Sequence, residues 1–186
     1  AEKKVGIEVE LLGEEGVRKH LPNVSKKILA ASYCPGEGKI NPMLATPVLA
    51  KESERLGTKF YLETTVISIK KEKKYFIVET NKGIIKSKYL VNAAGGWSNN
   101  ISEMLGIKIP VLSAPQQMIV TESSDPIIPS MISHAHRHLT MKQIKNGNLI
   151  IGGGWFAGYN KEMHRTFNYR NAISGNLWVA QRVVPS

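Results

Sequence analysis

A short apolar segment, residues 89–94, ends in two glycines and is followed at once by a helix-like segment that begins at Trp97. Its apolar residues are consecutive rather than alternating, which is typical of a strand buried on both faces, often in a parallel sheet. Small side chains at the end of such a strand let a ligand approach the backbone, and a following helix N-terminus attracts anions. The segment predicts either a site for a phosphate-bearing cofactor or a tight turn packed against a neighbour.

The other residues have the composition of a globular protein. The chain has 186 residues, 42% hydrophobic and 22% charged, which argues against wholesale disorder. No apolar run approaches the ~18 residues that cross a bilayer, so we expect no transmembrane segment. Cys34 is the only cysteine, which excludes a disulfide within the chain and a thiolate zinc site. A single cysteine favours a reducing compartment, and we expect a cytoplasmic protein.

The net charge of +10 allows nucleic acid, anionic lipid or acidic ligands as partners. The lysines are scattered, however, and the densest run, residues 70–74, falls between two strand-like segments, where a solvated hairpin turn is expected. A nucleic-acid-binding domain would rest on the charge alone, because no motif that reads DNA or RNA is present. We therefore expect no nucleic-acid partner.

Capping residues predict two helices in the first third of the chain. Residues 14–20 form a short helix that ends before a proline. Asn41 and Pro42 are a good N-cap and first residue for a stronger helix that Gly57 ends. Pro47 should kink this helix or delay its start. Its apolar stripe consists of Leu44, Val48, Leu49 and Leu56.

Alternating apolar and β-branched residues predict strands in the middle and the last third. The Asn146-Gly147 pair predicts a tight hairpin turn. Trp97 to Gly106 looks like a helix that Ser98 could cap, and residues 165–183 have helical stretches with a weak point at Gly175. The strands are expected at residues 59–63, 66–70, 75–80, 84–86, 89–94, 117–122, 137–144 and 148–151.

The run of glycines at residues 152–154 fits a loose form of the dinucleotide fingerprint. That motif needs a helix to begin at the glycines, and here Gly158 and the residues after it break one. No acidic residue stands about twenty positions on to hold a ribose. A strand end or bulge, where another chain segment packs closely, is the favoured interpretation.

Three alternating histidines, His134, His136 and His138, could place two ligands for zinc or iron on one face of a strand. No carboxylate lies nearby in sequence to complete such a set, so a polar loop leading into a strand is favoured and no metal is expected. Cys34 precedes a Pro-Gly pair with no basic neighbour, which is typical of an incidental thiol rather than a catalytic one.

Six segments follow one another in an order that carries further information. They are Leu12-x5-Arg18-x-x-Leu21-Pro22, Ala31-x-Tyr33-Cys34-Pro35-x-Glu37-Gly38-x-Ile40-Asn41-Pro42, Thr64-Thr65-Val66-x3-Lys70, the Tyr89–Ser98 segment, Pro115-x-Gln117-Met118-x-Val120-Thr121-Glu122, and Gly147 to Gly154. This series resembles the D-amino-acid oxidase, glycine oxidase and sarcosine oxidase family of flavoproteins, and the residues 89–98 are its most specific part. In that family, residues like 31–42 cover the substrate.

The resemblance implies an FAD-dependent oxidoreductase that oxidises an amine or amino acid. In such enzymes the flavin takes a hydride equivalent from the carbon next to nitrogen, and the imine is hydrolysed in water. It also implies an α+β fold with a mixed, largely antiparallel sheet and flanking helices. The family's N-terminal G-x-G-x-x-G unit and its C-terminal flavin loop have no counterpart here, so the chain resembles a middle fragment. Residues 41–106 would belong partly to the FAD-binding domain, and residues 1–40 and 107–186 mostly to the substrate domain.

The family's pattern also suggests site residues. The backbone of Val66 would meet the adenine of FAD. The pyrophosphate side would be lined by Ala93, Ala94, Gly95 and Trp97. The substrate cavity would be faced by His138, Met141 and Lys142, with Lys142 as a point charge for a carboxylate.

Two points stay open. Glycine oxidases have a Tyr and an Arg where this chain has Leu139 and Lys142, so it is open whether an arginine binds the substrate carboxylate. No acid–base pair stands out in the sequence, and the catalytic residue stays unknown because the flavin supplies the chemistry. A partner subunit and a small amine or amino-acid substrate are the expected partners. The alternative is a non-catalytic binding module of the same fold without bound flavin.

Overall fold

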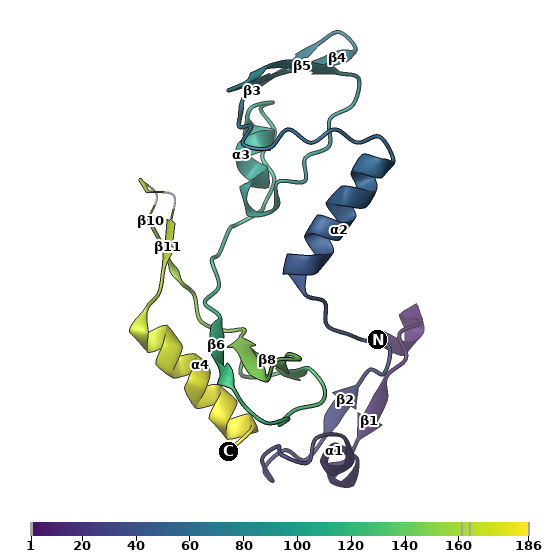
Figure 1. The fold of residues 1–186 in the computed structure, drawn as a ribbon, viewed down its shortest axis with the longest axis vertical. Helices are drawn as coiled ribbons and strands as arrows, with labels where there is room; N and C mark the ends of the chain where they lie inside the picture. Colours follow the sequence, from purple (N-terminus) through teal and green to yellow (C-terminus); the bar gives the residue numbers. More distant parts are fainter. Residues whose placement is uncertain (1, 161, 164, 186) are drawn as a thin grey trace. The chain divides into compact units, whose positions relative to one another are not determined.

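The computed structural model describes residues 2–160, 162–163 and 165–185. It divides into two compact units (Figure 1). The flanking unit contains Ala1–Ile40 with Pro115–Ser186, and the middle unit is Asn41–Ala114. Every pair of strands in the described residues is antiparallel. This confirms an α+β fold built on antiparallel sheets.

The described residues of the flanking unit form three sheets and two α-helices. β1 pairs with β2, β10 pairs with β11, and a four-stranded sheet has the order β6-β9-β8-β7. Its elements are the 3-10 helix η1 (Glu2–Val5), β1 (Glu10–Leu12), α1 (Glu14–His20), β2 (Ala31–Tyr33), β6 (Ile119–Ser123), β7 (Ile132–His134), β8 (Leu139–Gln143), β9 (Asn148–Gly152), β10 (Gly158–Asn160), β11 (Arg165–Phe167) and α4 (Arg170–Val183).

The four-stranded sheet follows the predicted hairpin. β8 and β9 pair antiparallel, and Gly147 between them has a φ of 87°, a conformation that suits glycine in a tight turn. β8 begins at Leu139 rather than at Arg137, because the residues after His134 form a turn. His136 and His138 therefore lie in a polar turn that leads into a strand, as favoured from the sequence, whereas His134 is the last residue of β7.

One row of apolar side chains crosses the sheet and forms the core. Ile119, Ile151, Met141 and Ile132 are neighbours in register on adjacent strands, and α4 packs against β8 and β9. Burial of such a row is the main stabilising contribution to a sheet-and-helix layer. The core is completed by Val17, Val24, Ile128, Leu139, Leu149, Val179, Ala180, Val183 and Val184.

Helix α4 begins later than expected and continues through its glycine. Residues Arg165–Phe167 form β11 instead of helix. Gly175 does not break α4, because the ring of Trp155 lies where a Cβ at Gly175 would be. The packing thus requires a residue without a side chain at this position. The contact with the Trp155 ring offsets the roughly 1 kcal/mol by which glycine disfavours a helix.

The middle unit begins with helix α2 (Pro42–Arg55). The Asn41 side chain accepts a hydrogen bond from the backbone N–H of Met43 at 3.0 Å, and Gly57 has a φ of 98°, so both predicted ends are confirmed. Pro47 neither delays nor interrupts the helix. None of the helices in the described residues is long and apolar enough to cross a membrane.

An exposed ion pair supports the last turn of α2. Arg55 donates to the carboxylate of Glu52, three residues earlier, with a nitrogen–oxygen distance of 2.6 Å. The guanidinium lowers the pKa of the Glu52 carboxyl and the carboxylate raises the pKa of Arg55. Because the pair is exposed to water, its contribution to stability is small.

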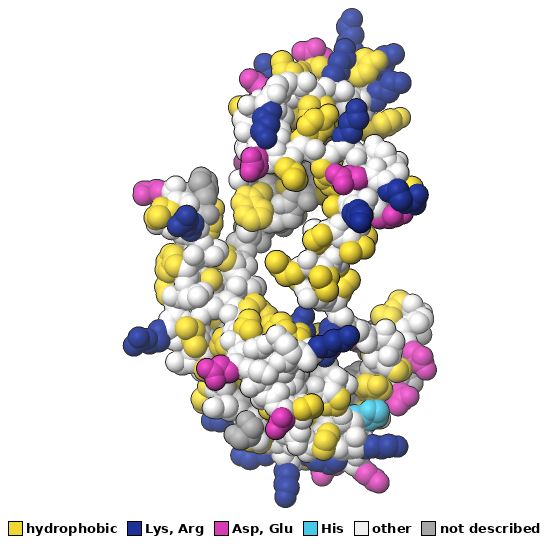
Figure 2. Space-filling view, in the orientation of Figure 1, with side chains coloured by type: hydrophobic (Ala, Val, Ile, Leu, Met, Phe, Trp, Pro, Cys, Tyr) yellow, Lys and Arg dark blue, Asp and Glu magenta, His cyan; other side chains and the backbone are white. Residues whose placement is uncertain are grey.

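A three-stranded sheet follows in the order β3-β4-β5, with β3 (Val66–Glu72), β4 (Tyr75–Thr80) and β5 (Gly83–Ser87). The lysine run lies at the exposed β3–β4 turn, where Lys73 has a φ of 51°. Lysine side chains project from this sheet (Figure 2). The predicted hairpin is confirmed, whereas the strand predicted at residues 59–63 is wrong, since the segment bends and Glu63 takes a φ of 52°.

The strand predicted at residues 89–94 is also wrong. The segment has no strand pairing, and Tyr89 and Val91 are 85% and 84% exposed. A central strand needs hydrogen-bonding neighbours, and none pairs with this segment among the described residues. It leads into the 3-10 turn η2 (Gly95–Trp97) and α3 (Ser98–Glu103), so Ser98 is the first residue of the helix rather than its cap.

Gln143 ties the loop after β6 to the β8–β9 hairpin. Its buried side chain accepts a hydrogen bond from the backbone N–H of Ile127 at 2.7 Å. It donates to the carbonyl oxygens of Asp125 and Gly147, both at 2.9 Å. One side chain thus holds backbone groups of both segments. The relative position of the loop and the hairpin, which are distant in sequence, therefore depends on Gln143.

We predict that Gln143→Met in the full-length protein lowers the free energy of unfolding by about 1–3 kcal/mol, because buried backbone groups lose their partner. Urea denaturation measures this change. The matched control is Gln116→Met at an exposed glutamine, which should change it by less than ~0.5 kcal/mol. Equal effects of the two substitutions would contradict the role given to Gln143.

Candidate functional site

The four-stranded sheet has one face packed against α4 and one face that is open. Because side chains alternate along strands, the neighbours of the core row point to the other side. Val120, Ile150 and Lys142 are in register across β6, β9 and β8, and Thr140 pairs with Ser133. We call this set the open face. Val120 is 64% exposed there, whereas Lys142 and Ile150 are half-buried.

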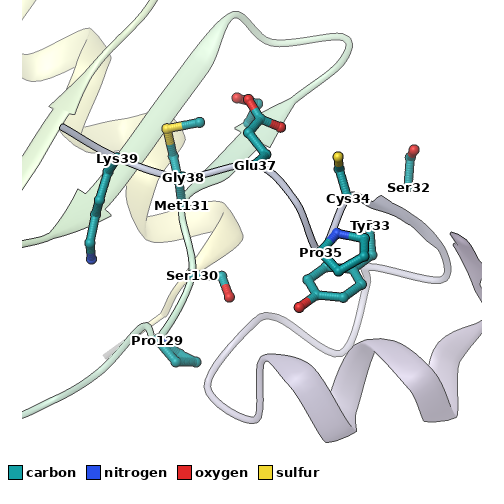
Figure 3. A pocket seen from close by; sticks show the side chains of 11 residues that line it. Ser32, Tyr33, Cys34, Pro35, Glu37, Gly38, Lys39, Pro129, Ser130 and Met131 are labelled. Atoms are coloured by element: carbon teal, nitrogen blue, oxygen red, sulfur yellow. The ribbon is translucent and has the colours of Figure 1, made fainter. Parts of the chain in front are cut away.

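A pocket of about 290 Å³ lies beside the open face at the β7 edge (Figure 3). Met131 and Ser133 flank the buried Ile132, so they point to the side of the open face. The segment that follows β2 lines the pocket as well, through Cys34, Glu37 and Lys39 among others (Figure 3).

The segment after β2 is held beside the sheet by one lysine. The ammonium of Lys39 donates a hydrogen bond to the carbonyl oxygen of Gln143 at the end of β8. The N–H of Glu37 donates to the carbonyl of Cys34, which closes a turn in the segment. These bonds position residues 34–39 beside the sheet.

The three residues expected at the substrate cavity do not share one environment. Met141 is 3% exposed and belongs to the core row. Lys142 is the next residue on β8, so its side chain lies on the open face. His138 is exposed in the turn before β8, with a φ of 49°. Of the three, only Lys142 is on the open face.

Three of the residues expected at the pyrophosphate of FAD lie together in a turn of the middle unit. Ala93 and Gly95 are exposed and Ala94 is half-buried. Asn92 holds the turn, because its side chain accepts from the N–H of Ala94 and donates to the carbonyl of Ser98. A Cβ added at Gly95 would meet nothing within 4 Å. The backbone of this turn is therefore open to a close ligand.

Trp97 follows this turn and is 62% exposed. Val66 lies elsewhere in the same unit, at the start of β3, beside an irregularity in the pairing with β4. The backbone of Thr65 is fixed next to it by a hydrogen bond from its N–H to the Asn81 side chain. Segment 107–114 belongs to this unit as well, since the N–H of Ile109 donates to the Asn99 side chain.

The glycines at the end of β9 serve packing. Gly153 has a φ of 117°, and a Cβ there would overlap the carbonyl oxygen of His138. A Cβ at Gly152 would overlap the Met118 side chain. No helix begins at these glycines. They form a strand end with a close neighbouring segment, as favoured from the sequence, rather than a phosphate loop.

The histidines and Cys34 give no sign of metal binding. The Nδ1 atom of His134 accepts hydrogen bonds from the N–H groups of His136 and Arg137 at 3.2 and 3.1 Å. Within residues 2–160, 162–163 and 165–185, no group of three His, Cys, Asp or Glu side chains could hold a metal ion. Cys34 is a free thiol that lines the pocket.

The sequence analysis did not identify the residues that share the open face with Lys142. Thr140 could have been found from the alternation along residues 139–143. Val120, Ile150 and Ser133 needed the register between strands that are distant in sequence, and no local pattern carries that information.

Comparison with known proteins connects these features. The family model described as "FAD dependent oxidoreductase" matches residues 1–185. The chain belongs to this family. The match covers almost the whole chain and therefore both units, and it confirms the resemblance inferred from the sequence.

Individual proteins also resemble the chain. The sarcosine oxidase subunit beta of Arthrobacter sp. is 26% identical over 161 residues, which are 83% of this chain and 40% of that protein. The structure of L-proline dehydrogenase from P. horikoshii has a TM-score of 0.87 at 26% identity, covering 98% of this chain and 50% of that one. Glycine oxidase from Geobacillus kaustophilus shares the fold, with a TM-score of 0.81 at 17% identity and coverage of 98% and 48%. The chain thus spans about half the length of these relatives.

We predict that Gly153→Ala in the full-length protein lowers the free energy of unfolding by about 1–3 kcal/mol, because of the positive φ and the close backbone of His138. FAD affinity should stay within about twofold, since the glycines are a packing feature. Chemical denaturation and flavin titration measure the two effects. Gly38→Ala, where a Cβ has open space, is the control. A loss of flavin affinity at unchanged stability would point to a phosphate loop instead.

Proposed function

We propose that this chain is part of a longer enzyme that uses FAD to oxidise an amine or an amino acid at a carbon–nitrogen bond. The match of residues 1–185 to the FAD-dependent oxidoreductase family carries this proposal. The names of the relatives support the substrate class, since sarcosine, proline and glycine are all amino acids with an oxidisable carbon–nitrogen bond.

The turn of the middle unit fits FAD. Ala93, Ala94 and Gly95 leave the backbone accessible, and no side chain fills the space above Gly95. An open backbone of this kind suits the pyrophosphate of a dinucleotide. We propose that this turn and Trp97 hold the pyrophosphate side and that the Val66 backbone meets the adenine. When bound, FAD supplies the two-electron oxidation of the substrate.

The open face supports a role in substrate binding. Lys142 is a half-buried cation flanked in register by the apolar Ile150, so an anion beside it would be less screened than at an exposed site. We propose that its ammonium binds the substrate carboxylate as a point charge. The hydroxyl groups of Thr140 and Ser133 lie on the same face and could orient a polar substrate. Residues 34–39 would exclude water as the cover of the site. We leave Met141 out of the site because it lies in the core, and His138 stays a peripheral candidate.

The two units then take different tasks. We propose that the middle unit belongs to the FAD-binding domain and the flanking unit to the substrate-binding domain. Apolar side chains of α2 are exposed (Figure 2), and the helix has no buried residue. A surface of this kind is typical of a contact with further protein. It supports the placement of this chain within a longer protein. We propose that this protein has a partner subunit and is cytoplasmic. The single cysteine supports the cytoplasmic location. The exposed apolar side chains are those of Met43, Leu44, Val48 and Leu49 in α2 and of Leu56, its C-cap.

We expect Lys142→Met in the full-length enzyme to raise KM for amino-acid substrates roughly ten- to hundredfold, because a charge-assisted hydrogen bond to the carboxylate is lost. The value of kcat should change little, as expected for a binding contact. Steady-state kinetics with an amino acid and with the matching amine that lacks a carboxylate measure the effect. Lys145→Met, at an exposed lysine of the hairpin, is the control. An unchanged KM for both substrates would remove Lys142 from the site.

Ala93→Asp should weaken FAD binding by at least about tenfold, because a carboxylate would face the pyrophosphate. Ala114→Asp introduces the same charge at another exposed alanine of the middle unit and should leave FAD binding unchanged. Fluorescence titration of the deflavinated full-length protein gives both dissociation constants. Absence of flavin binding in the unchanged protein would instead favour a non-catalytic module of the same fold.

A further inference from the structure

A second pocket, of about 630 Å³, lies on the α4 side of the flanking unit. Three segments line it: the loop after α1, the turn after β7 and the last turns of α4. Its polar and aromatic lining consists of Ser25, Lys27, His134, Arg137, Trp178, Gln181 and Arg182. We call it the basic pocket. The substrate face proposed above lies on the other side of the sheet, so the basic pocket is a separate feature.

The loop that carries Lys27 is rigidly held. The guanidinium of Arg18 donates to the carbonyl oxygens of Val24, Ser25 and Ile28 at 3.2, 3.0 and 2.8 Å. The N–H of Ser25 donates to the carbonyl of Val183 at 2.8 Å, which joins the loop to the end of α4. A loop fixed at both its centre and its contact with α4 loses little entropy when a ligand binds.

The turn after β7 is held in a comparable way. His134 Nδ1 accepts from the N–H groups of His136 and Arg137, so the proton of the neutral ring is on Nε2. His134 therefore offers a hydrogen-bond donor at Nε2, in a pocket that also contains the Gln181 amide. The same two hydrogen bonds fix the backbone that carries Arg137.

The charges of the pocket are not neutralised within it. Lys27, Arg137 and Arg182 bring three cations together, and its described lining contains no Asp or Glu. Across the described residues, the one ion pair is that of Arg55 with Glu52 in the other unit. The Arg182 guanidinium carbon lies 3.8 Å from the centre of a Trp178 ring and that of Arg137 lies 5.2 Å from it. The indole thus holds both guanidinium groups in place through cation–π contacts.

We propose that the basic pocket binds the phosphate group of a small organic phosphate. Phosphate carries close to two negative charges and three acceptor oxygens, and guanidinium groups match that arrangement through paired N–H donors. Three cations and the donor groups of His134 and Gln181 provide for this charge and for several hydrogen bonds. The volume lies within the range of sites for metabolite-sized ligands.

Calorimetric titration of the flavin-loaded full-length protein with ribose 5-phosphate, at physiological salt, tests this proposal. Ribose without the phosphate is the ligand control. The test variant is Lys27→Met with Arg137→Met, and the matched control is Lys26→Met with Lys145→Met, two exposed lysines outside the pocket. We expect one molecule of ribose 5-phosphate per chain and no binding of ribose. The test variant should bind roughly ten- to hundredfold more weakly, and the control should be unchanged.

Three results would overturn the proposal: no binding of ribose 5-phosphate at millimolar concentration, equal weakening in both double variants, or equal binding of ribose. Binding only to vesicles of phosphatidylserine would overturn it as well, since it would assign the charge to a membrane surface. If the test variant unfolds, Lys27→Met alone takes its place, because the Lys27 side chain makes no hydrogen bond in the described structure. The measurement reads binding rather than oxidation, so its outcome does not depend on the proposed enzyme activity.

Discussion

The packing of α4 against one face of the four-stranded sheet determines what the other face can do. In the row from Ile119 to Ile132, Ile151, Met141 and Ile132 are buried and Ile119 is partly buried, and α4 packs against β8 and β9. Strand alternation then leaves Lys142 and its neighbours on the opposite side. A single hydrophobic contact thus separates a structural face from a face available to a ligand. The same contact places the basic pocket, at the end of α4, on the structural side.

Local signals in the sequence predicted the elements whose causes are local. The cap at Asn41, the end at Gly57 and the Asn146-Gly147 turn depend on a few adjacent residues, and the structure contains all three. The strand predicted at residues 89–94 was wrong. An apolar pattern indicates a tendency to be buried, but it does not show whether another strand is present to pair with the segment. Met141 and Lys142 are adjacent residues of one strand, and the alternation along residues 139–143 places Met141 with Leu139 on the face that packs into the core.

Two glycine-rich segments of the chain have different physical uses. At the end of β9 the glycines exist because another backbone is too close for a side chain, as the overlap at Gly153 with His138 demonstrates. Above Gly95 there is empty space, and only its positive φ of 55° favours glycine at that position. The sequence left a ligand site open for residues 89–98 and already favoured a packed strand end for residues 152–154. The surroundings of the missing Cβ atoms give the physical reason, because Gly153 is crowded and Gly95 is not.

The ring of Trp155 against Gly175 also sets the rotational position of α4. Turning the helix by one residue rotates its surface by about 100°, which would bring a side chain onto the indole. Asn176, the next residue, is buried and donates to the carbonyl of Gln117, so the same setting is secured twice. Trp178 and Arg182 lie on this helix, so the contact of Gly175 with Trp155 also sets the direction of their side chains. The contact between Trp155 and Gly175 thus determines which side chains the C-terminal half of α4 presents to solvent.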